Sequence, residues 1–281
     1  MERILSLRSD GLKKLHQLIL GDARHFQLIY LSSFLVFGIY SLGWELEVTR
    51  YLIIAVSCVL TQLVGARIVG ASPSSWKSAL ITALGLSLLL HSSALWISAL
   101  SGVLAIGSKF ILRFNGKHIF NPANFGIILC ILLTDQAWVS PGQWGSDIIL
   151  IYFFGAAALM VLLKVGRIDT SLAFILTLFA LEATRTVFYL GWGWDVLFHS
   201  FSNGSLLLFT FFMITDPVTT PKSKKARIIW ASGIAVLSFI LSQWFFVYTA
   251  PIWALFIAAP FTAIFNKTMK GETFHWIPTS K

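Results

Sequence analysis

Two short polar segments interrupt an otherwise apolar chain, and they carry the residue types that could bind a ligand. The first is SKFILRFNGKHIFNPANFGI (residues 108–127), and the second is FFMITDPVTTPKSKKAR (residues 211–227). In the first, Asn121 is a suitable N-cap and Pro122 suits the first turn of a helix, where its missing N–H costs nothing. In the second, Asp216 stands at the end of an apolar run, which Pro217 would end or kink.

These two segments have a structural interpretation and a functional one. Asn-Pro and Asp-Pro are ordinary helix punctuation, and the basic residues from Lys222 to Arg227 would anchor the chain to lipid headgroups. The functional interpretation is that broken helices within a membrane present their free ends and polar side chains to a buried polar ligand. Asp216 is the strongest ionisable candidate for such a site, because buried ionisable residues are functional candidates in membranes.

The composition places these segments in a membrane protein. The chain has 281 residues, of which 57% are hydrophobic and only 12% charged, and its mean hydropathy is +0.79. A soluble domain carries roughly 25% charged residues. We expect no cleavable signal peptide, because residues 1–25 carry charges throughout; they predict an amphipathic N-terminal segment on the cytoplasmic membrane surface.

Apolar runs predict an all-α integral membrane protein of about ten transmembrane helices, since a helix needs about 20 apolar residues to span the hydrocarbon layer. Two runs are short, and Ser202-Asn203-Gly204 interrupts a third, which predicts broken or re-entrant helices. The predicted spans are 26–44, 51–70, 78–91, 93–112, 121–134, 148–164, 169–190, 196–214, 228–247 and 250–265.

The positive charges predict the orientation of these spans. If the N-terminus is cytoplasmic and the chain crosses ten times, all of the 21 basic residues except Arg50 and Arg185 fall on the cytoplasmic side. Such a bias is the signature of a correct topology. We therefore expect a multi-pass protein of the inner (plasma) membrane with both termini in the cytoplasm. The net charge of +9 then reflects topology, so we expect the lipid bilayer and not nucleic acid as a partner.

The chain predicts one transmembrane domain, residues 26–267, followed by a cytoplasmic tail, residues 268–281. Its spans divide into two sets of five, about 26–134 and 148–265, joined by the outer loop DQAWVSPGQWGSD. An odd number of spans in each half would give the halves opposite orientations, which predicts two inverted five-helix repeats.

The pair FNPANFG and FMITDPVTTP, in this order and spacing, resembles the RnfD/NqrB family. Its members are the D subunit of the Rnf electron-transport complex and the B subunit of the sodium-translocating NADH:quinone reductase. The resemblance runs from about residue 50 to 267 and includes the closing PFTAIFN helix. It implies ten helices in two inverted halves, related to urea-transporter-like channels. It also implies flavin cofactors and electron transfer through the membrane, coupled to Na⁺ or H⁺ in full complexes.

Two departures qualify this resemblance. The family attaches FMN covalently to a Ser-Gly-Ala-Thr stretch in the outer loop, but here that loop has only Ser140 and Ser146 in other contexts, which argues against covalent FMN. Asn266 stands where family members often have an acidic residue, which weakens ion coupling through that position. We therefore expect riboflavin or FMN to be held non-covalently. The expected polar partners of the flavin are Arg113, Asn115, Asn121, Asn124, Thr215, Asp216 and Thr219.

Other residue patterns give less support to a specific chemistry. Cys58 and Cys130 both lie in apolar runs, which favours packed thiols over an iron–sulfur site shared with another subunit. Glu182 and Arg185 lie three residues apart on one helix and would neutralise each other. The six histidines lie in tails, loops or span ends, which does not favour a membrane haem. No hydrolase or ATP-binding motif is present.

The leading hypothesis is a flavin-binding membrane protein that takes part in transmembrane electron transfer, with possible ion coupling. It has no NADH site of its own, so it would act within a redox-driven ion-translocating oxidoreductase and rely on redox partner subunits or an electron-donor protein. The first alternative is a transporter or channel for a small solute, which could be riboflavin, on the same scaffold. The second alternative is a structural subunit that anchors soluble partners.

Overall fold

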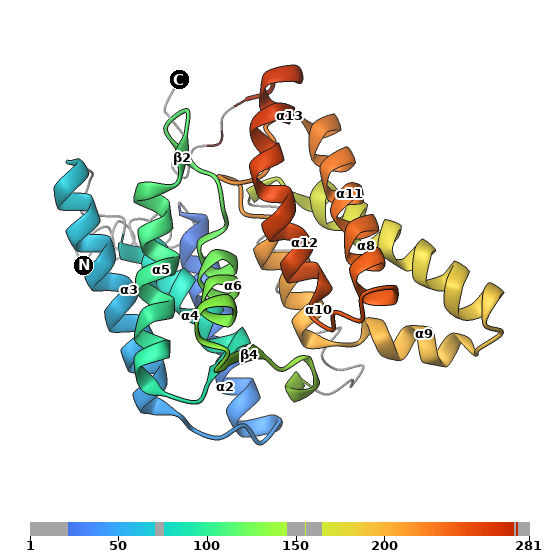
Figure 1. Ribbon diagram of the computed structural model, residues 1–281, viewed down its shortest axis with the longest axis horizontal. Helices are drawn as coiled ribbons and strands as arrows, with labels where there is room; N and C mark the ends of the chain where they lie inside the picture. The colour runs from blue at the N-terminus through green and yellow to red at the C-terminus, as the bar shows by residue number, and fades with distance from the viewer. Residues whose placement is uncertain (1–21, 71–75, 145–154, 156–164, 273, 275–281) are drawn as a thin grey trace, which may run out of the picture.

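The fold of the computed structural model is almost entirely helical, and two groups of helices stand side by side (Figure 1). The structure describes residues 22–70, 76–144, 155, 165–272 and 274. The α-helices are α2 (Ala23–Ser41), α3 (Val48–Val69), α4 (Trp76–Leu89), α5 (Leu95–Ile111), α6 (Pro122–Thr134), α8 (Ile168–Ala183), α9 (Trp194–Phe201), α10 (Gly204–Leu208), α11 (Lys224–Gln243), α12 (Ala250–Ala258) and α13 (Thr262–Thr268).

Short irregular helices and strands connect or extend these elements. Two π-helices, η3 (Thr184–Tyr189) and η4 (Phe209–Met213), continue α8 and α10, and two 3₁₀ turns are η2 (Pro141–Trp144) and η5 (Ala259–Phe261). The antiparallel strand pairs are β1 (Leu90–Ser92) with β4 (Ala137–Val139), and β2 (Arg113–Phe114) with β3 (Lys117–His118).

Several helices have the length and composition of membrane spans. Four of the described helical stretches qualify: Val48–Val69, Ile168–Tyr189, Lys224–Gln243 and Ala250–Thr268. A fifth is formed if the pair Trp194–Phe201 and Gly204–Met213 is one span, bent by 56° at the predicted Ser202-Asn203-Gly204 break. The helices α4, α5 and α6 are apolar but shorter. The predicted span 148–164 lies outside the described residues, as do residues 1–21 of the predicted N-terminal segment and most of the predicted tail.

Local sequence explains where the broken helices begin. The Asn121 side chain accepts a hydrogen bond from the Asn124 amide (3.1 Å), and Pro122 occupies the first turn of α6, so this helix starts as predicted. Likewise Asn203 accepts from the amide of Ser205 (2.8 Å) and caps α10. The helix α11 begins at Lys224, four residues before the predicted apolar run, so Lys224, Lys225 and Arg227 lie in its first turn.

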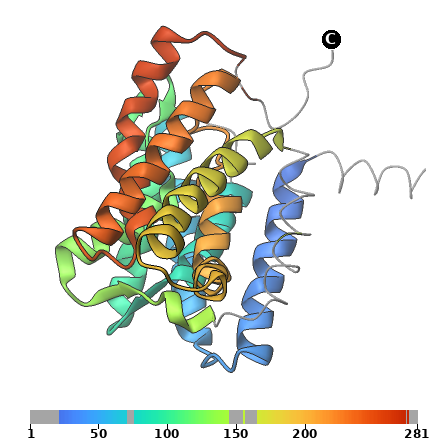
Figure 2. The same cartoon turned by 90° about the vertical axis from the view of Figure 1, so that its right-hand side faces the viewer.

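The packing pattern is similar in the two groups. In the first, α3 packs against α4 and α5, and α5 packs against α6. In the second, α11 packs between α8 and α12. The groups meet where α6 contacts α12. In Figure 2, α2 (blue) and α12–α13 (red) lie on opposite sides of the view.

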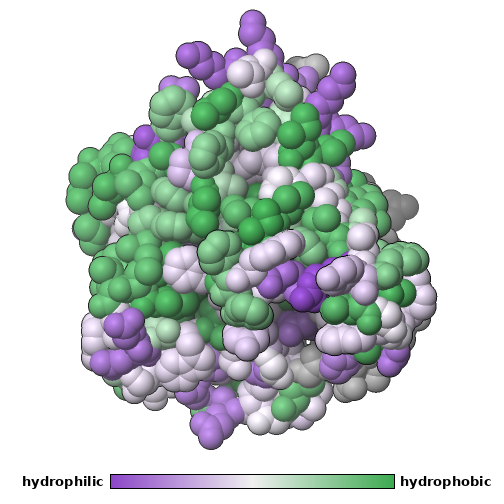
Figure 3. Space-filling view, turned by 45° about the vertical axis from the view of Figure 1, so that its right-hand side comes forward, coloured by the Kyte–Doolittle hydropathy of each residue, from purple (hydrophilic) through white to green (hydrophobic). Residues whose placement is uncertain are grey.

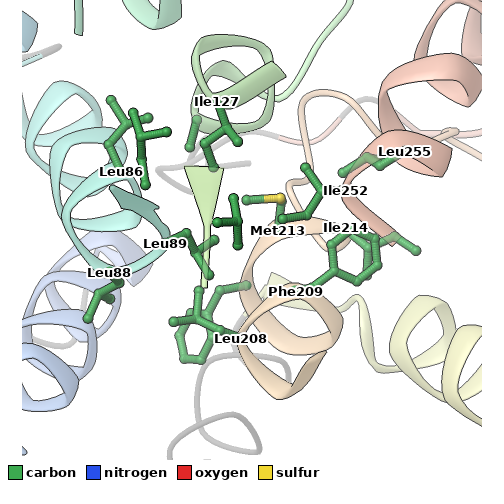
Figure 4. Packing of buried hydrophobic residues seen from close by; sticks show 14 of the residues in the cluster. Leu86, Leu88, Leu89, Ile127, Leu208, Phe209, Met213, Ile214, Ile252 and Leu255 are labelled. Carbon is green, nitrogen blue, oxygen red and sulfur yellow. The ribbon is translucent and has the colours of Figure 1, made fainter. Parts of the chain in front are cut away.

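One continuous apolar core joins the two groups of helices. Leu86, Leu89 and Ile127 come from the first group, and Figure 4 shows them facing Met213 and Ile252 of the second. All five side chains are less than 9% exposed, so the apolar contact between the groups stabilises their arrangement.

The outer surface is apolar along the sides of the bundle. Large side chains such as Leu52, Leu60, Leu176, Ile229 and Ile264 are each more than half exposed. Hydrophobic residues cover much of the face in Figure 3, and hydrophilic residues gather at its top. Exposed apolar surface of this extent is suited to lipid.

The bundle has two ends, which we name by their residues. The motif end, at the top of Figure 1, carries the β2–β3 hairpin, the segment after η4 and the last helix α13. The opposite end, at the bottom, carries the β1–β4 pair, η2 and the turn between α11 and α12.

Candidate functional site

The two polar segments singled out in the sequence meet in the structure. The side-chain amide of Asn121 donates to the main-chain carbonyl of Met213 (3.2 Å), which lies just before the Asp-Pro turn. The Asn124 amide donates to the carbonyl of Ile252 in α12 (2.8 Å). Two asparagines at the start of α6 therefore bind the main chain of the second helix group.

His118 and Asp216 form a second link between the segments. The His118 Nε2 lies 3.8 Å from a carboxylate oxygen of Asp216, and both side chains are about one-sixth exposed (16%). The other carboxylate oxygen accepts from the Val218 amide (3.0 Å). Burial by itself raises the pKa of Asp216, but the interactions with His118, the Val218 amide and Lys109 together outweigh it, so the pKa lies below the usual 3.8. Asp216 is therefore held as a carboxylate.

A small cavity lies beside this link, and we call it the inner cavity. Its volume is about 120 Å³. His118, Asn121 and Asp216 line it from the motif segments, together with both apolar and polar side chains of α2, α4 and η4. Examples of these are Gln27, Leu31, Ser78, Ile81 and Phe212.

A second cavity, the basic cavity, lies on the other side of His118 and has a volume of about 310 Å³. His118 and Val218 line both cavities. The basic cavity is also lined by Asn115, Lys117, Thr219, Lys222, Thr262 and Lys267. Its lining comes from the β2–β3 hairpin, the turn after Asp216, and α13.

The predicted binding residues fall into distinct positions around these cavities. Asn121 and Asp216 line the inner cavity, and Asn115 and Thr219 line the basic cavity. Asn124 is 1% exposed, and its carbonyl oxygen has no hydrogen-bond partner among the described residues.

The other three predicted residues, Asn124 among them, line neither cavity. Arg113 is exposed and donates to the Gly116 carbonyl within its own hairpin. The hydroxyl of Thr215 is buried and donates to the Phe211 carbonyl one turn earlier (2.7 Å). These two residues stabilise local structure in this conformation.

The structure also adds residues that sequence patterns did not indicate. Gln27 and Ser78 line the inner cavity from α2 and α4, and neither belongs to a recognisable motif. Lys109 lies nearby, because its ammonium group donates to Ser78 (3.3 Å) and to Gln62 (2.6 Å). A polar residue in an apolar helix was the only available signal for them.

A larger cavity of about 510 Å³ lies at the opposite end, and we call it the outer cavity. Glu182, Arg185 and Gln243 contribute to its lining. The expected pairing of Glu182 with Arg185 is not seen: within the described residues they form no ion pair, and the Glu182 carboxylate accepts instead from Gln243 (2.9 and 3.0 Å). Arg185 lies in the π-helical turn at residues 184–189, where the regular α-helical i, i+3 spacing does not continue.

The described part of the chain contains neither a candidate metal site nor a pair of bonded cysteines. There, no group of three or more His, Cys, Asp or Glu side chains could hold a metal ion. Cys58 and Cys130 are both fully buried in the apolar core as free thiols, as the packed-thiol interpretation predicted.

Comparison with known proteins places this architecture in a family. The model of the NQR2, RnfD, RnfE family matches residues 132–275, which include the Asp-Pro segment. The D subunit of the ion-translocating oxidoreductase complex from Pseudomonas paraeruginosa (strain DSM 24068 / PA7) is 29% identical over 226 residues, covering 59% of this chain and 65% of that protein.

Two further relatives carry the same name. The protein from Stutzerimonas stutzeri is 33% identical over 105 residues, or 37% of this chain and 29% of that protein. The protein from Cellvibrio japonicus (strain Ueda107) is 28% identical over 129 residues, or 43% of this chain and 35% of that protein. The chain spans less than two thirds of the length of these relatives.

The long apolar helices, the exposed apolar sides and the broken helices define a multi-pass membrane protein. The family match covers half of the chain and includes one of the two motifs that meet at the site. The chain belongs to the NQR2, RnfD, RnfE family.

Proposed function

We propose that this protein is a membrane subunit of an ion-translocating oxidoreductase that carries electrons across the inner membrane by means of a non-covalently bound flavin. The observation that carries this proposal is the meeting of the two family motifs beside two cavities at the motif end. The relatives, which are named as the D subunit of such a complex, support the electron-transfer and ion-transport role. They also support redox subunits as its partners.

The composition of the two cavities fits a flavin ring. An isoalloxazine needs apolar walls and a few amide or hydroxyl partners. Leu31, Ile81 and Phe212 supply such walls in the inner cavity, and Gln27 and Ser78 supply polar atoms there. The side-chain carbonyl oxygen of Asn124 has no partner among the described residues, and its sequence neighbour Ala123 lines the inner cavity.

The volumes require that both cavities contribute. Small-molecule sites usually have about 300–1,000 Å³. The inner cavity is below that range, and the basic cavity is at its lower edge. Because the His118 side chain lines both, its rotation would join them into one larger site. The flavin would therefore contact His118 directly.

The flavin, when bound, would supply the one- and two-electron chemistry that the protein side chains lack. The chain itself would bind and orient it. Asp216, held as a carboxylate, and the His118 imidazole lie together beside both cavities. Apolar side chains of α4 and η4 would cover one side of the bound ring.

Non-covalent binding is part of the proposal. Ser140 lies at the opposite end beside η2, while Ser146 lies outside the described residues. Ser140 is also far in the fold from the motif segments, which occupy the other end of the bundle. The cavities at the motif end therefore offer no attachment point related to the outer loop.

We also propose the inverted-repeat topology with both termini in the cytoplasm. The same packing order supports it: α3 with α5 and α5 with α6 in the first half, and α8 with α11 and α11 with α12 in the second. Both α6 and α12 have a proline in their first turn. The motif end would then face the cytoplasm.

Cysteine accessibility tests this orientation, because both native cysteines are buried. Arg113→Cys reports on the motif end and Tyr248→Cys on the opposite end, and both positions are exposed. In intact cells, a thiol reagent that does not cross the membrane should label only Tyr248→Cys. Labelling of Arg113→Cys alone would reverse the proposed orientation.

Copurification tests the flavin. The purified protein should be yellow and should release riboflavin or FMN on denaturation, identified by mass spectrometry. Ile81→Trp should fill the inner cavity and lower flavin occupancy about tenfold or more, while Val56→Trp, on the lipid-facing side of α3, should not. A colourless protein that binds no added flavin would contradict the proposal.

A transporter for a small solute, such as riboflavin, is the second candidate. The cavities at the two ends of the bundle favour it, because alternating access needs a site reachable from each side. Proteoliposomes without any redox partner would distinguish the two functions. Saturable uptake of riboflavin would favour the transporter, and its absence in a flavin-loaded protein would favour the electron carrier.

A further inference from the structure

The basic cavity has a chemical character that the flavin-ring proposal does not use. Three lysines, Lys117, Lys222 and Lys267, line it together with His118. No acidic residue lines it among the described residues. Outside the lining, Asp216 is the acidic side chain in contact with this group, and it is already paired with His118. The cavity therefore carries an excess of positive charge.

The lysines have no side-chain partners within the described part of the chain. None of the three ammonium groups forms a hydrogen bond or ion pair with another described residue. Two other basic residues near this end do have acidic partners. Arg227 pairs with Asp169 at 2.6 Å, and Lys77 lies 3.4 Å from Asp22.

Burial and neighbouring cations also affect the protonation of Lys117. Burial lowers the pKa of Lys117 from its usual 10.5, and the charges of Lys222 and Arg167 lower it further. Arg167 donates to the hydroxyl of Thr220 (3.1 Å) and also has no ion pair among the described residues. An anion in the cavity would relieve this repulsion.

A buried hydroxyl provides a second, independent observation. Thr262 begins α13 and lines the basic cavity, and it is only 8% exposed. Its hydroxyl oxygen has no hydrogen-bond partner among the described residues. A buried polar group without a partner costs about 1–3 kcal/mol, so a ligand that accepted a hydrogen bond from this hydroxyl would remove that cost.

The combination points to one functional group. We propose that the basic cavity binds the phosphate of a phosphate monoester, with Lys117, Lys222 and Lys267 as its cationic partners and the Thr262 hydroxyl as a donor. A phosphate monoester carries about −1.5 to −2 charges at pH 7 and offers three acceptor oxygens. A carboxylate would leave more of the lysine charge uncompensated. Lysine also binds phosphate as a point charge without demanding the planar geometry of arginine.

The neighbouring inner cavity suggests which ester would bring that phosphate. His118 lines both cavities, so a ligand whose ring reached from the inner cavity past His118 would place a side-chain phosphate in the basic cavity. This makes FMN a better ligand than riboflavin. The choice of FMN rests on the proposed function, whereas the phosphate site itself does not. The headgroup of phosphatidic acid offers the same phosphate chemistry and is the other source to be distinguished.

The test compares two flavins that differ only in the phosphate. The full chain is placed in nanodiscs of phosphatidylcholine and titrated with FMN and with riboflavin, following flavin fluorescence. We expect FMN to bind about tenfold more tightly or better, because a charge-assisted hydrogen bond contributes about 1.5–3 kcal/mol and 1.4 kcal/mol is tenfold. Inorganic phosphate should compete with FMN and not with riboflavin.

Variants separate the site from general charge effects. Lys117→Gln and Lys267→Gln should each weaken FMN binding about tenfold and leave riboflavin binding unchanged, and Thr262→Val should weaken it about threefold to tenfold. Lys224→Gln and Lys270→Gln are matched controls, because both lysines lie at the same end and neither lines the cavity. Unchanged riboflavin binding shows that each variant is folded.

The outcomes separate the two proposals. Equal affinities for FMN and riboflavin, with no effect of the lysine variants, would overturn the phosphate site and leave the flavin proposal standing. Failure of both flavins, with inorganic phosphate still bound in a Lys267-dependent way, would overturn the flavin proposal and support the phosphate site. If phosphatidic acid in the nanodiscs displaces phosphate from the wild type but not from Lys267→Gln, the site is supported and its phosphate comes from lipid. If none of these probes binds, both proposals fail.

Discussion

The two ends of the bundle use polar residues in different ways. At the motif end, Asn121 and Asn124 bind main-chain carbonyls across the boundary between the helix groups, and Arg227 pairs with Asp169. At the opposite end, the outer cavity is larger, and the buried hydroxyl of Ser205 has no partner among the described residues. The motif end thus joins the two helix groups through asparagine side chains, whereas the opposite end places a buried hydroxyl beside its larger cavity.

This difference changes how an asparagine in a membrane motif should be interpreted. The sequence favours a ligand for Asn121 and Asn124 because they are polar groups at a helix break. In the structure, both side-chain amides of this pair are used to hold the two helix groups together. In the proposed site, binding would fall mainly to residues around them, above all His118 and the basic side chains. A motif can therefore mark a site without supplying most of its contacts.

The strongest test of this contrast is the buried ion pair at the motif end. Arg227 and Asp169 lie 2.6 Å apart with side chains about one-tenth exposed, and they join α11 to α8. Arg227→Leu should destabilise the protein by about 3–5 kcal/mol, because it leaves a buried carboxylate without its partner. Unfolding in a denaturing-detergent titration would measure this. A decrease in the free energy of unfolding of less than about 1 kcal/mol would show that this ion pair does not stabilise the motif end.

The bonds between the helix groups should have the next largest effect. Asn124→Leu removes the bond to the Ile252 carbonyl and should cost about 2 kcal/mol. The effect should be on stability with little loss of FMN affinity, if this asparagine is a fastening residue. The same detergent titration, together with the flavin titration, separates the two roles. A large loss of affinity in a stable variant would assign Asn124 to the ligand instead.

The outer cavity offers the matching test at the opposite end. Gln243→Leu removes both hydrogen bonds to the Glu182 carboxylate and should cost about 1.5 kcal/mol. The double variant Gln243→Leu with Glu182→Leu should recover part of that loss, since the partner that lost its donor is also removed. Thermal unfolding in mild detergent would show it. No recovery would mean that Glu182 is solvated in the single variant.

The smallest expected effect is a pH dependence at His118 and Asp216. The folded-state pKa of Asp216 is lower than its usual 3.8, so its carboxylate stabilises the fold above that pH. This stabilisation is lost as the pH falls through the lowered pKa. Asp216→Asn should thus unfold at a lower temperature than wild type at about pH 6, with a difference that shrinks below about pH 4. A difference that is constant down to acidic pH would exclude this contribution.

The helices were largely predictable from the sequence, because lipid imposes a length and an apolar character on each span. The break at Asn203 and the start of α6 at Pro122 were also predictable, since capping is local chemistry. The pairing of β1 with β4 was not, because it joins residues that are 45 or more positions apart and lack a strand pattern. The inner cavity was predicted only in part: Gln27 and Ser78 are single polar residues whose position depends on helix rotation.

The bond from Asn124 to Ile252 has a consequence for how this chain can diverge. Its acceptor is a peptide carbonyl, which every amino acid at position 252 would supply. This hydrogen bond between the helix groups therefore depends on the side chain of Asn124 and not on the side chain at position 252. Asparagine must be kept in α6, whereas its counterpart in α12 is free to change among apolar residues of similar size. Homologues could then conserve the asparagine at position 124 while the residue at position 252 varies, so an alignment would not reveal that the two positions are in contact.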